Sequence, residues 1–287
     1  MRRLVIACVV SVFAYAAVFG WVVDRPLAYG FLEEQIDAKL KRGAVLQRPK
    51  LVILAGSNGP YSHRCEIIEP IVGIPCVNGG VAVGIGLDYL FARWKKLLHR
   101  GDVVYLPMEE AQYGRTKAGT AVGPDAAIMF RHDWGTLSEL PLNRWLGALF
   151  SFDLRFAVMA LIEHGLLAGG FHDPREEATG RTNAWGDHVG HVAALGDPEG
   201  AAARPAHLRA AEVREGFAAN VIAGFVRWGE AQGVRIIGGW SAEPEDSPMP
   251  EAARAALRAV YLANGGDFLE LPNRSLYPRA ARAKPPT

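Results

Sequence analysis

The sequence predicts an α/β protein with three layers (α/β/α), in which helices cover both faces of a five-stranded, mainly parallel sheet. Short apolar runs alternate along the chain with longer segments whose apolar residues recur at helical spacing, as in repeated strand–helix–strand units. The chain has 287 residues and is 50% hydrophobic, so it is long enough to bury one sizeable core. One globular domain with extensions is therefore expected.

The first predicted strand is 51–55, a continuous apolar run that suits a parallel strand buried on both faces. The segment 111–205 has little periodicity, and two long loops are expected within it, at 115–133 and 169–200. Further strands are expected at 74–80, 103–106, 233–237 and 267–271. Helices are expected at 61–71, 87–99, 154–167, 207–232 and 250–263.

The N-terminus predicts a membrane anchor. Arg2 and Arg3 precede an uncharged apolar stretch over 4–23, which at about 1.5 Å per residue is roughly as long as the hydrocarbon core is thick. The two arginines place this end inside, so we expect a single-pass protein of the bacterial inner membrane with its globular domain in the periplasm. A signal peptide cleaved after 14–16 is the alternative. The expected division is an anchor over 1–23, a connector over 24–47 and a globular domain over 48–287.

The net charge and the cysteine content exclude some classes of partner and of metal site. The formal net charge is +1, so no electrostatic field attracts nucleic acid, and a nucleic-acid partner is not expected. Cys65 and Cys76 either pair in an oxidising periplasm or are two buried small hydrophobic residues. Their spacing is not that of a CxxC motif, so a metal site built on cysteine is not expected.

A serine follows the first predicted strand at a sharp turn. Ser57 lies between Gly56 and Asn58, and a segment suited to a helix follows, so it is either a nucleophile or a helix N-cap. The carboxyl ends of the first three strands should meet at one edge of the sheet. There, the backbone N–H groups of Ser57 and of Gly79 or Gly80 are candidate oxyanion donors.

These short motifs resemble the SGNH (GDSL-type) hydrolases. The likeness covers about residues 50–110: the Gly56-Ser57-Asn58 turn, the strand that ends at 78–80, and the strand over 102–106. It is closest to membrane-anchored periplasmic relatives that act in acyl modification of exported polysaccharides such as alginate and cellulose. The resemblance implies a sheet of the SGNH or flavodoxin-like kind and a Ser–His–Asp site with an oxyanion hole, which handles acyl esters without a cofactor.

The chain departs from that family in two places. Where the family has an asparagine after the third strand, this sequence has Pro107-Met108 followed by Glu109 and Glu110. The family also takes its catalytic Asp and His from an Asp-x-x-His after the last strand, and 271–287 contains neither residue. Without a base, a serine hydroxyl is a poor nucleophile at neutral pH.

Substitutes for these residues are found elsewhere. Asp187, His188 and His191 are the candidate acid and bases, and the alternative is a solvated polar loop. No spacing of histidines in this region, His172 and Asp173 included, matches a pair of metal ligands on a helix, so no metal is expected. The expected oxyanion and substrate-binding residues are Asn58, Asn78, Gly79, Gly80, Glu109 and Glu110. The two glutamates either orient a histidine, bind a sugar hydroxyl, or serve as a cap or surface residues. We expect His63 to face away from the site.

Two functions follow from these observations. The first is an SGNH-type esterase or acyltransferase that uses Ser57 on acyl, chiefly acetyl, groups of an exported polysaccharide or an acyl donor. The second is an inactive accessory subunit that binds polysaccharide, a membrane-bound acyltransferase or a polysaccharide synthase complex. A third interpretation is that the likeness is only that of any parallel α/β sheet.

Overall fold

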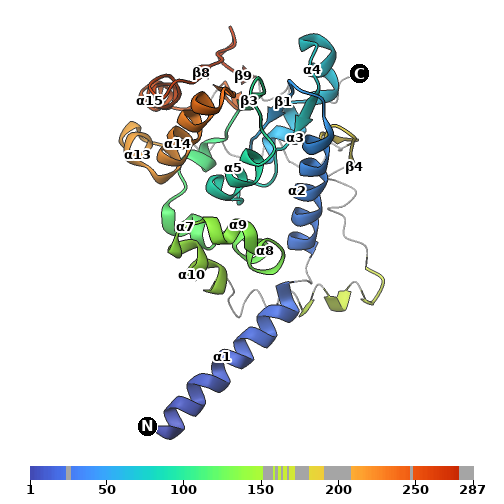
Figure 1. The fold of residues 1–287 in the computed structure, drawn as a ribbon, viewed down its shortest axis with the longest axis vertical. Coiled ribbons are helices and arrows are strands. Elements are labelled where there is room, and N and C mark those ends of the chain that lie inside the picture. The colour runs from blue at the N-terminus through green and yellow to red at the C-terminus, as the bar shows by residue number, and fades with distance from the viewer. Residues whose placement is uncertain are drawn as a thin grey trace. The chain divides into compact units, whose positions relative to one another are not determined.

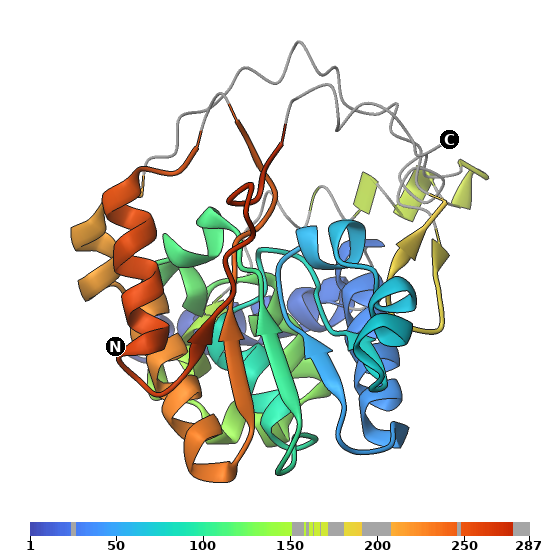
Figure 2. The same ribbon diagram turned by 90° about the horizontal axis from the view of Figure 1, so that it is seen from above.

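The computed structural model describes residues 1–23, 27–150, 181–190, 208–245 and 248–277, together with isolated positions between 158 and 171. Its centre is a five-stranded sheet in the order β2-β1-β3-β6-β8, in which every pair of neighbours is parallel. Figure 2 shows the strands side by side with their arrows in a common direction. The strands are β1 (Leu51–Ile53), β2 (Cys76–Asn78), β3 (Val103–Leu106), β6 (Arg235–Gly238) and β8 (Asp267–Phe268).

The predicted parallel α/β sheet is therefore confirmed. Counted within this sheet alone, its strand order is 2-1-3-4-5, the order of flavodoxin-like sheets. Such a sheet has a switch point between its first and third strands, because the connections that leave those two strands run to opposite sides. Ligands bind in open α/β sheets outside the carboxyl ends of the strands at this point.

Helices connect the strands (Figure 1), as the apolar periodicity predicts. Two findings differ from the prediction. The helix expected over 61–71 is two helices, with a break at His63 and Arg64. The helix expected over 207–232 is also two helices, because Gly216 adopts an extended conformation between them. The helix bounds are α3 (Asn58–Ser62), α4 (Cys65–Val72), α5 (Leu87–Lys95), α13 (Ala210–Glu215), α14 (Phe217–Gln232) and α15 (Glu251–Leu262). Two further pairs of short strands are β4 (Arg181–Thr182) with β5 (His188–Val189), and β7 (Glu243–Pro244) with β9 (Leu276–Tyr277).

A disulfide joins Cys65, the first residue of α4, to Cys76 in β2, with a Cα–Cα distance of 5.3 Å. Both cysteines are buried with Leu51 and Ile53 in one apolar cluster, so the bond lies where α4 packs on the sheet. The pairing of the two cysteines, one of the two alternatives that the sequence leaves, is thereby confirmed.

Helix α2 (Leu27–Val45) covers most of the predicted connector. Its residues from Gln35 onward belong to the same compact unit as the sheet. Ile36, Lys39 and Leu40 are buried there, so this part of α2 contributes to the core of that unit rather than only linking it to the N-terminus. An amphipathic helix with alternating charges gives no sign of this in the sequence.

A second compact unit contains residues 1–34 and 121–173. The long loop expected over 115–133 is wrong, because two short helices lie within it, at Lys117–Ala121 and Pro124–His132. The chain from here to 150 forms short helices that are interrupted at Gly123, Asp133 and Leu140. None of them is long enough for a helical spacing of apolar residues to be recognised in the sequence. Most of the helix expected over 154–167 lies outside the described residues. Among the described residues, helices α8 (Pro124–His132), α9 (Trp134–Glu139) and α10 (Leu142–Phe150) lie in this unit. Helices α6 (Glu110–Tyr113) and α7 (Lys117–Ala121), apart from Ala121 itself, belong to the unit that contains the sheet.

Helix α1 (Arg2–Val23) coincides with the predicted membrane anchor. Within the part of the chain that the structure describes, no helix combines the length and the apolar character needed to cross a membrane. The predicted transmembrane anchor is therefore not supported.

Candidate functional site

Ser57 lies directly after β1, at the carboxyl edge of the sheet, and its side chain is exposed. It occupies the N-cap position of α3, yet its hydroxyl makes no capping hydrogen bond to that helix. The preceding residue must be small, because a Cβ on Gly56 would lie only 2.7 Å from Glu109 Oε1 and from Val83. The glycine thus allows a carboxylate from the turn after β3 to approach the serine closely.

That carboxylate is Glu109. The Ser57 hydroxyl donates to Glu109 Oε1 at 3.3 Å, and the backbone N–H of Asn58 donates to the same oxygen at 2.8 Å. The Asn58 side-chain amide donates to the carbonyl oxygen of Pro107 at 2.8 Å, which ties the turn after β1 to the turn after β3. Ser57 and Glu109 therefore face each other across the switch point of the sheet.

Asn78 joins three segments of the chain from a fully buried position at the end of β2. Its amide group donates to the carbonyl oxygens of Gly59 (2.9 Å) and His63 (2.7 Å) and to Asp187 Oδ1 (3.1 Å). Its Oδ1 accepts the N–H of Gly80 at 3.1 Å. The Asn78 amide nitrogen therefore has no donor left for a substrate, and the side chain is fully buried.

The predicted oxyanion donors differ in availability. The Gly79 N–H donates to the carbonyl oxygen of Ile53 at 2.8 Å, and the Gly80 N–H is held by Asn78. Both are thus occupied within the protein. Among the described residues, the N–H of Ser57 makes no hydrogen bond, and it is the donor that remains for a substrate oxygen.

Asp187 contacts the start of α4. Its two carboxylate oxygens accept the N–H groups of Cys65 (2.9 Å) and Glu66 (3.0 Å) from a fully buried position. A carboxylate there satisfies two helix N–H groups that would otherwise lack partners, and it is favoured by the helix dipole. This contact also explains the break between α3 and α4, because a new helix begins where Asp187 caps it.

His188 lies in β5, is 5% exposed and stacks on the ring of Tyr61, with 4.6 Å between the ring centroids. Its Nδ1 is 3.4 Å from the Thr182 hydroxyl, and its Nε2 is 3.5 Å from the Gln35 amide nitrogen. None of these contacts is with Asp187, the residue expected to orient the imidazole ring. His191 lies outside the described residues.

His63 packs against the sheet, and its contacts are with residues other than Ser57 and Glu109. Its ring meets Tyr105 of β3 edge-on, with 5.6 Å between centroids, and its Nδ1 is 2.9 Å from the Ser62 hydroxyl. Burial lowers the pKa of the His63 imidazole to about 4, so this ring is neutral at pH 7.

Lys39 is a residue of this region that the sequence does not reveal. It reaches from α2 and is 2% exposed, and its Nζ donates to the carbonyl oxygen of Gly80. Burial lowers the pKa of Lys39 to about 7, while the negative charge of Asp187 acts in the opposite direction. A lysine on an amphipathic helix is usually a solvated surface residue, so its sequence position carries no signal.

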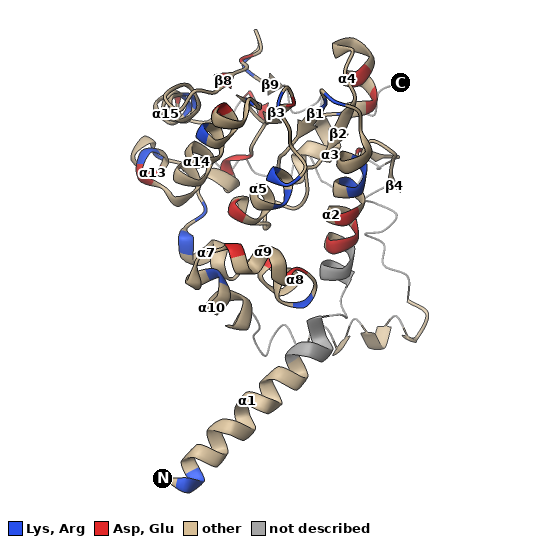
Figure 3. Cartoon of the chain, in the orientation of Figure 1, with Lys and Arg blue, Asp and Glu red and all other residues tan. Residues whose placement is uncertain are grey.

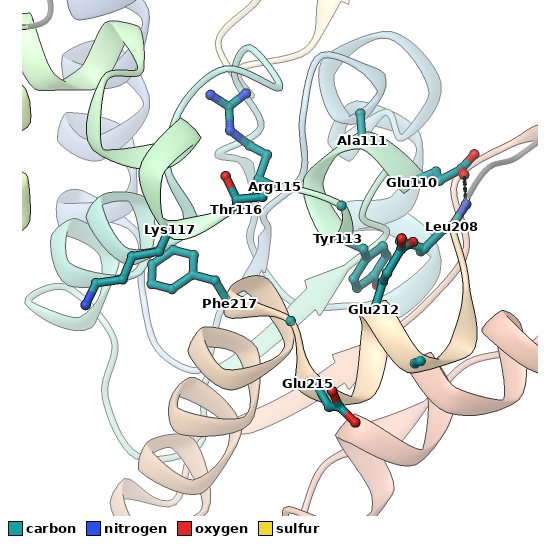
Figure 4. Close-up of a pocket in the computed structure, with 13 residues that line it drawn as sticks. Glu110, Ala111, Tyr113, Arg115, Thr116, Lys117, Leu208, Glu212, Glu215 and Phe217 are labelled. Atoms are coloured by element: carbon teal, nitrogen blue, oxygen red, sulfur yellow. Dashed lines mark hydrogen bonds between the residues drawn. The ribbon is translucent and has the colours of Figure 1, made fainter.

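Glu110 points elsewhere than Glu109. It lines a cavity of about 820 Å³, where its carboxylate accepts the N–H of Leu208 at 2.9 Å (Figure 4). Arg115, Thr116 and Lys117 line one side of this cavity in Figure 4, and the aromatic ring of Phe217 lies beside them. The cavity is also lined by Ala111, Tyr113, Gly114, Ala211, Glu212, Glu215 and Gly216.

In the described part of the chain, no three His, Cys, Asp or Glu side chains are grouped closely enough to hold a metal ion. Among the residues that the sequence singles out, the exposed Ser57 contacts the partly exposed Glu109, whereas Asn78 and Asp187 belong to a buried cluster. No family model, curated protein or solved structure matches this chain.

Proposed function

We propose that this protein is an SGNH-type esterase or acyltransferase that acts on acyl groups, chiefly acetyl, of an exported polysaccharide such as cellulose or alginate. One observation carries the proposal: an exposed serine at the turn after β1 directs its hydroxyl to the carboxylate of Glu109. The flavodoxin-like strand order supports an SGNH-like α/β/α domain, and it places this pair at the edge where such sheets bind ligands.

In the proposed reaction, Glu109 takes the proton of the Ser57 hydroxyl as Oγ attacks the carbonyl carbon of an acyl ester. The N–H of Ser57 stabilises the oxyanion that forms. As this intermediate collapses, the bond between the acyl carbon and the sugar oxygen breaks, and that oxygen receives the proton from Glu109. An acyl-serine remains.

The second half of the reaction reverses the first. Water, or a hydroxyl of a second sugar, attacks the acyl-serine and gives its proton to Glu109, and the proton returns to Oγ as Ser57 leaves. Water as the attacking group gives an esterase, and a sugar hydroxyl gives an acyltransferase. The cavity beside Glu110 is large enough for a sugar unit, and its mixture of charged side chains with Phe217 suits polar hydroxyls and an apolar ring face.

We also propose that the domain works in the periplasm, held at the inner membrane through α1. The Cys65–Cys76 disulfide supports an oxidising compartment, because cytosolic proteins seldom keep such bonds.

An inactive accessory subunit is the second candidate, and a specific observation favours it. The N–H groups of Gly79 and Gly80 are occupied, and Asp187 caps α4, so several parts of a conventional site serve the structure instead. In that case the same edge of the sheet would bind polysaccharide, a membrane-bound acyltransferase or a polysaccharide synthase without reacting.

Covalent labelling separates the two candidates. The full chain is treated with a fluorophosphonate probe and, in parallel, with p-nitrophenyl acetate. We expect wild type to label and turn over, Ser57→Ala to lose both signals, and Ser62→Ala to keep them. Ser62 is a suitable control because it is also exposed and lies in α3, the helix that Ser57 precedes. Its hydroxyl donates to the Asn58 carbonyl oxygen instead of contacting Glu109. Equal labelling of wild type and Ser57→Ala would rule out the nucleophile.

A further inference from the structure

Helix α10 exposes its large apolar side chains and buries a charged one. Leu142, Leu146 and Phe150 are 72%, 50% and 68% exposed, and they recur at the spacing of a single helix face. Arg144, on the opposite face, is fully buried. A surface helix of a soluble protein normally shows the reverse arrangement.

A buried ion pair fixes this orientation. Arg144 pairs with Asp125 of α8, and both side chains are at most 1% exposed. Helix α10 also packs closely on Ala121, the last residue of α7, because a Cβ on Gly147 would overlap the backbone of Ala121. Rotating α10 to hide its leucines would break this buried ion pair, which is strongly destabilising. The outward apolar face is therefore built into this unit.

The same unit contains α1, whose large apolar side chains are exposed from Leu4 to Val18 and whose only charged residues are Arg2 and Arg3 (Figure 3). Tyr15 of α1 donates its hydroxyl to the carbonyl oxygen of Leu149 at 2.6 Å, and its ring lies 6.3 Å from that of Phe150. The apolar surfaces of α1 and α10 are thus contiguous.

Exposed apolar side chains are concentrated in this unit. Of the 27 large hydrophobic side chains that are exposed among the described residues, 20 lie in 1–34 or 121–173. Trp134, which is 49% exposed, packs edge-on against Trp145 of α10, with 5.1 Å between the rings. Tryptophans beside an apolar face are typical of elements that lie at the boundary between lipid and water.

We propose that α10 is an interfacial membrane helix, which inserts Leu142, Leu146, Leu149 and Phe150 into the lipid bilayer beside α1. A bilayer is favoured over a protein partner because the exposed surface continues onto α1, which is uncharged after Arg3. The inference does not depend on the proposed activity, because no residue of the Ser57 region takes part.

Labelled positions in the full chain test the proposal. In a Cys8→Ser background without reductant, the Cys65–Cys76 disulfide stays closed and a single added cysteine carries an environment-sensitive NBD fluorophore. The labelled positions are Leu146→Cys in α10, Phe13→Cys in α1 and Glu215→Cys in α13, which is exposed in the other unit. Each protein is reconstituted into vesicles of phosphatidylcholine and phosphatidylglycerol, with and without lipids that carry a doxyl quencher near the headgroup.

We expect the label at 146 to shift to the blue and to be quenched by the doxyl lipid, while the label at 215 stays accessible to aqueous iodide. Introducing Phe150→Glu and Leu142→Glu should reduce the lipid quenching at 146 several-fold and leave that at 13 unchanged. The proposal fails if the label at 146 stays open to iodide while the label at 13 is quenched. It also fails if the label at 146 is protected from iodide only at high protein concentration and is not quenched by the doxyl lipid. That result would indicate that a second copy of the chain covers α10.

Discussion

Two groups of polar residues meet at the carboxyl edge of the sheet, and they differ in what their atoms contact. Asn78, Asp187 and Lys39 are buried, and their side chains bind backbone groups of neighbouring turns. Ser57 and Glu109 are partly or fully exposed and bind each other. Because each group contains a carboxylate, residue type does not distinguish them. What distinguishes them is how many further hydrogen bonds their side chains can make.

This difference suggests a division of roles, in which the buried residues hold the turns in place and Ser57 and Glu109 remain accessible at the edge of the sheet. Asn78 ties the turn after β1 to the turn after β2, and Asp187 joins both to α4. Buried polar groups of this kind stabilise the structure only when every member has its partner. We therefore expect changes in the buried cluster to alter stability, and changes in Ser57 or Glu109 to alter reactivity.

The largest expected effect is that of Glu109→Gln on the labelling of Ser57. The amide oxygen still accepts the Asn58 N–H, but it is not a base, so we expect the rate of labelling and turnover to fall by about 10²–10⁴-fold. Rates measured over a range of probe concentrations check this. The control is Glu66→Gln in α4, whose exposed carboxylate pairs with Arg64. Equal rates for wild type and Glu109→Gln would mean that this carboxylate only positions the turn.

The next largest expected effect is that of Asp187→Ala on the stability of the fold. It removes the acceptor of two helix N–H groups and of the Asn78 amide, and buried donors without partners cost about 1–3 kcal/mol each. We expect a loss of roughly 2–5 kcal/mol in the free energy of unfolding, measured in urea without reductant.

The matched variant is Asp187→Asn, which keeps one oxygen acceptor and should lose less. The rate of Ser57 labelling, measured below the unfolding transition, should change little in either variant. Full stability combined with lost labelling would instead assign Asp187 to the reaction, as the sequence suggests.

The sequence predicts the sheet well because each buried strand is a short apolar run bounded by turn residues, as at 51–55 and 103–106. It also predicts that Ser57 and Glu109 share an edge, because parallel strands end together. It does not reveal the roles of Asp187 or Lys39, since both depend on contacts between segments more than forty residues apart. The sequence does not reveal the orientation of α10 either. The usual expectation is that a leucine is buried and an arginine is exposed, and α10 has the reverse.

The smallest expected effect concerns Lys39, whose pKa burial lowers from 10.5 to about 7. Between these two values the unfolded chain binds more protons at this site than the folded one, so stability should rise with pH, by up to about 1.4 kcal/mol per pH unit. Lys39→Met should remove this contribution, which urea unfolding at pH 7.5 and 9.0 measures. Lys41→Met, at an exposed position of the same helix, should keep it. If wild type and Lys39→Met gained stability equally over this range, Lys39 would not be a buried amine that loses its charge in the folded protein.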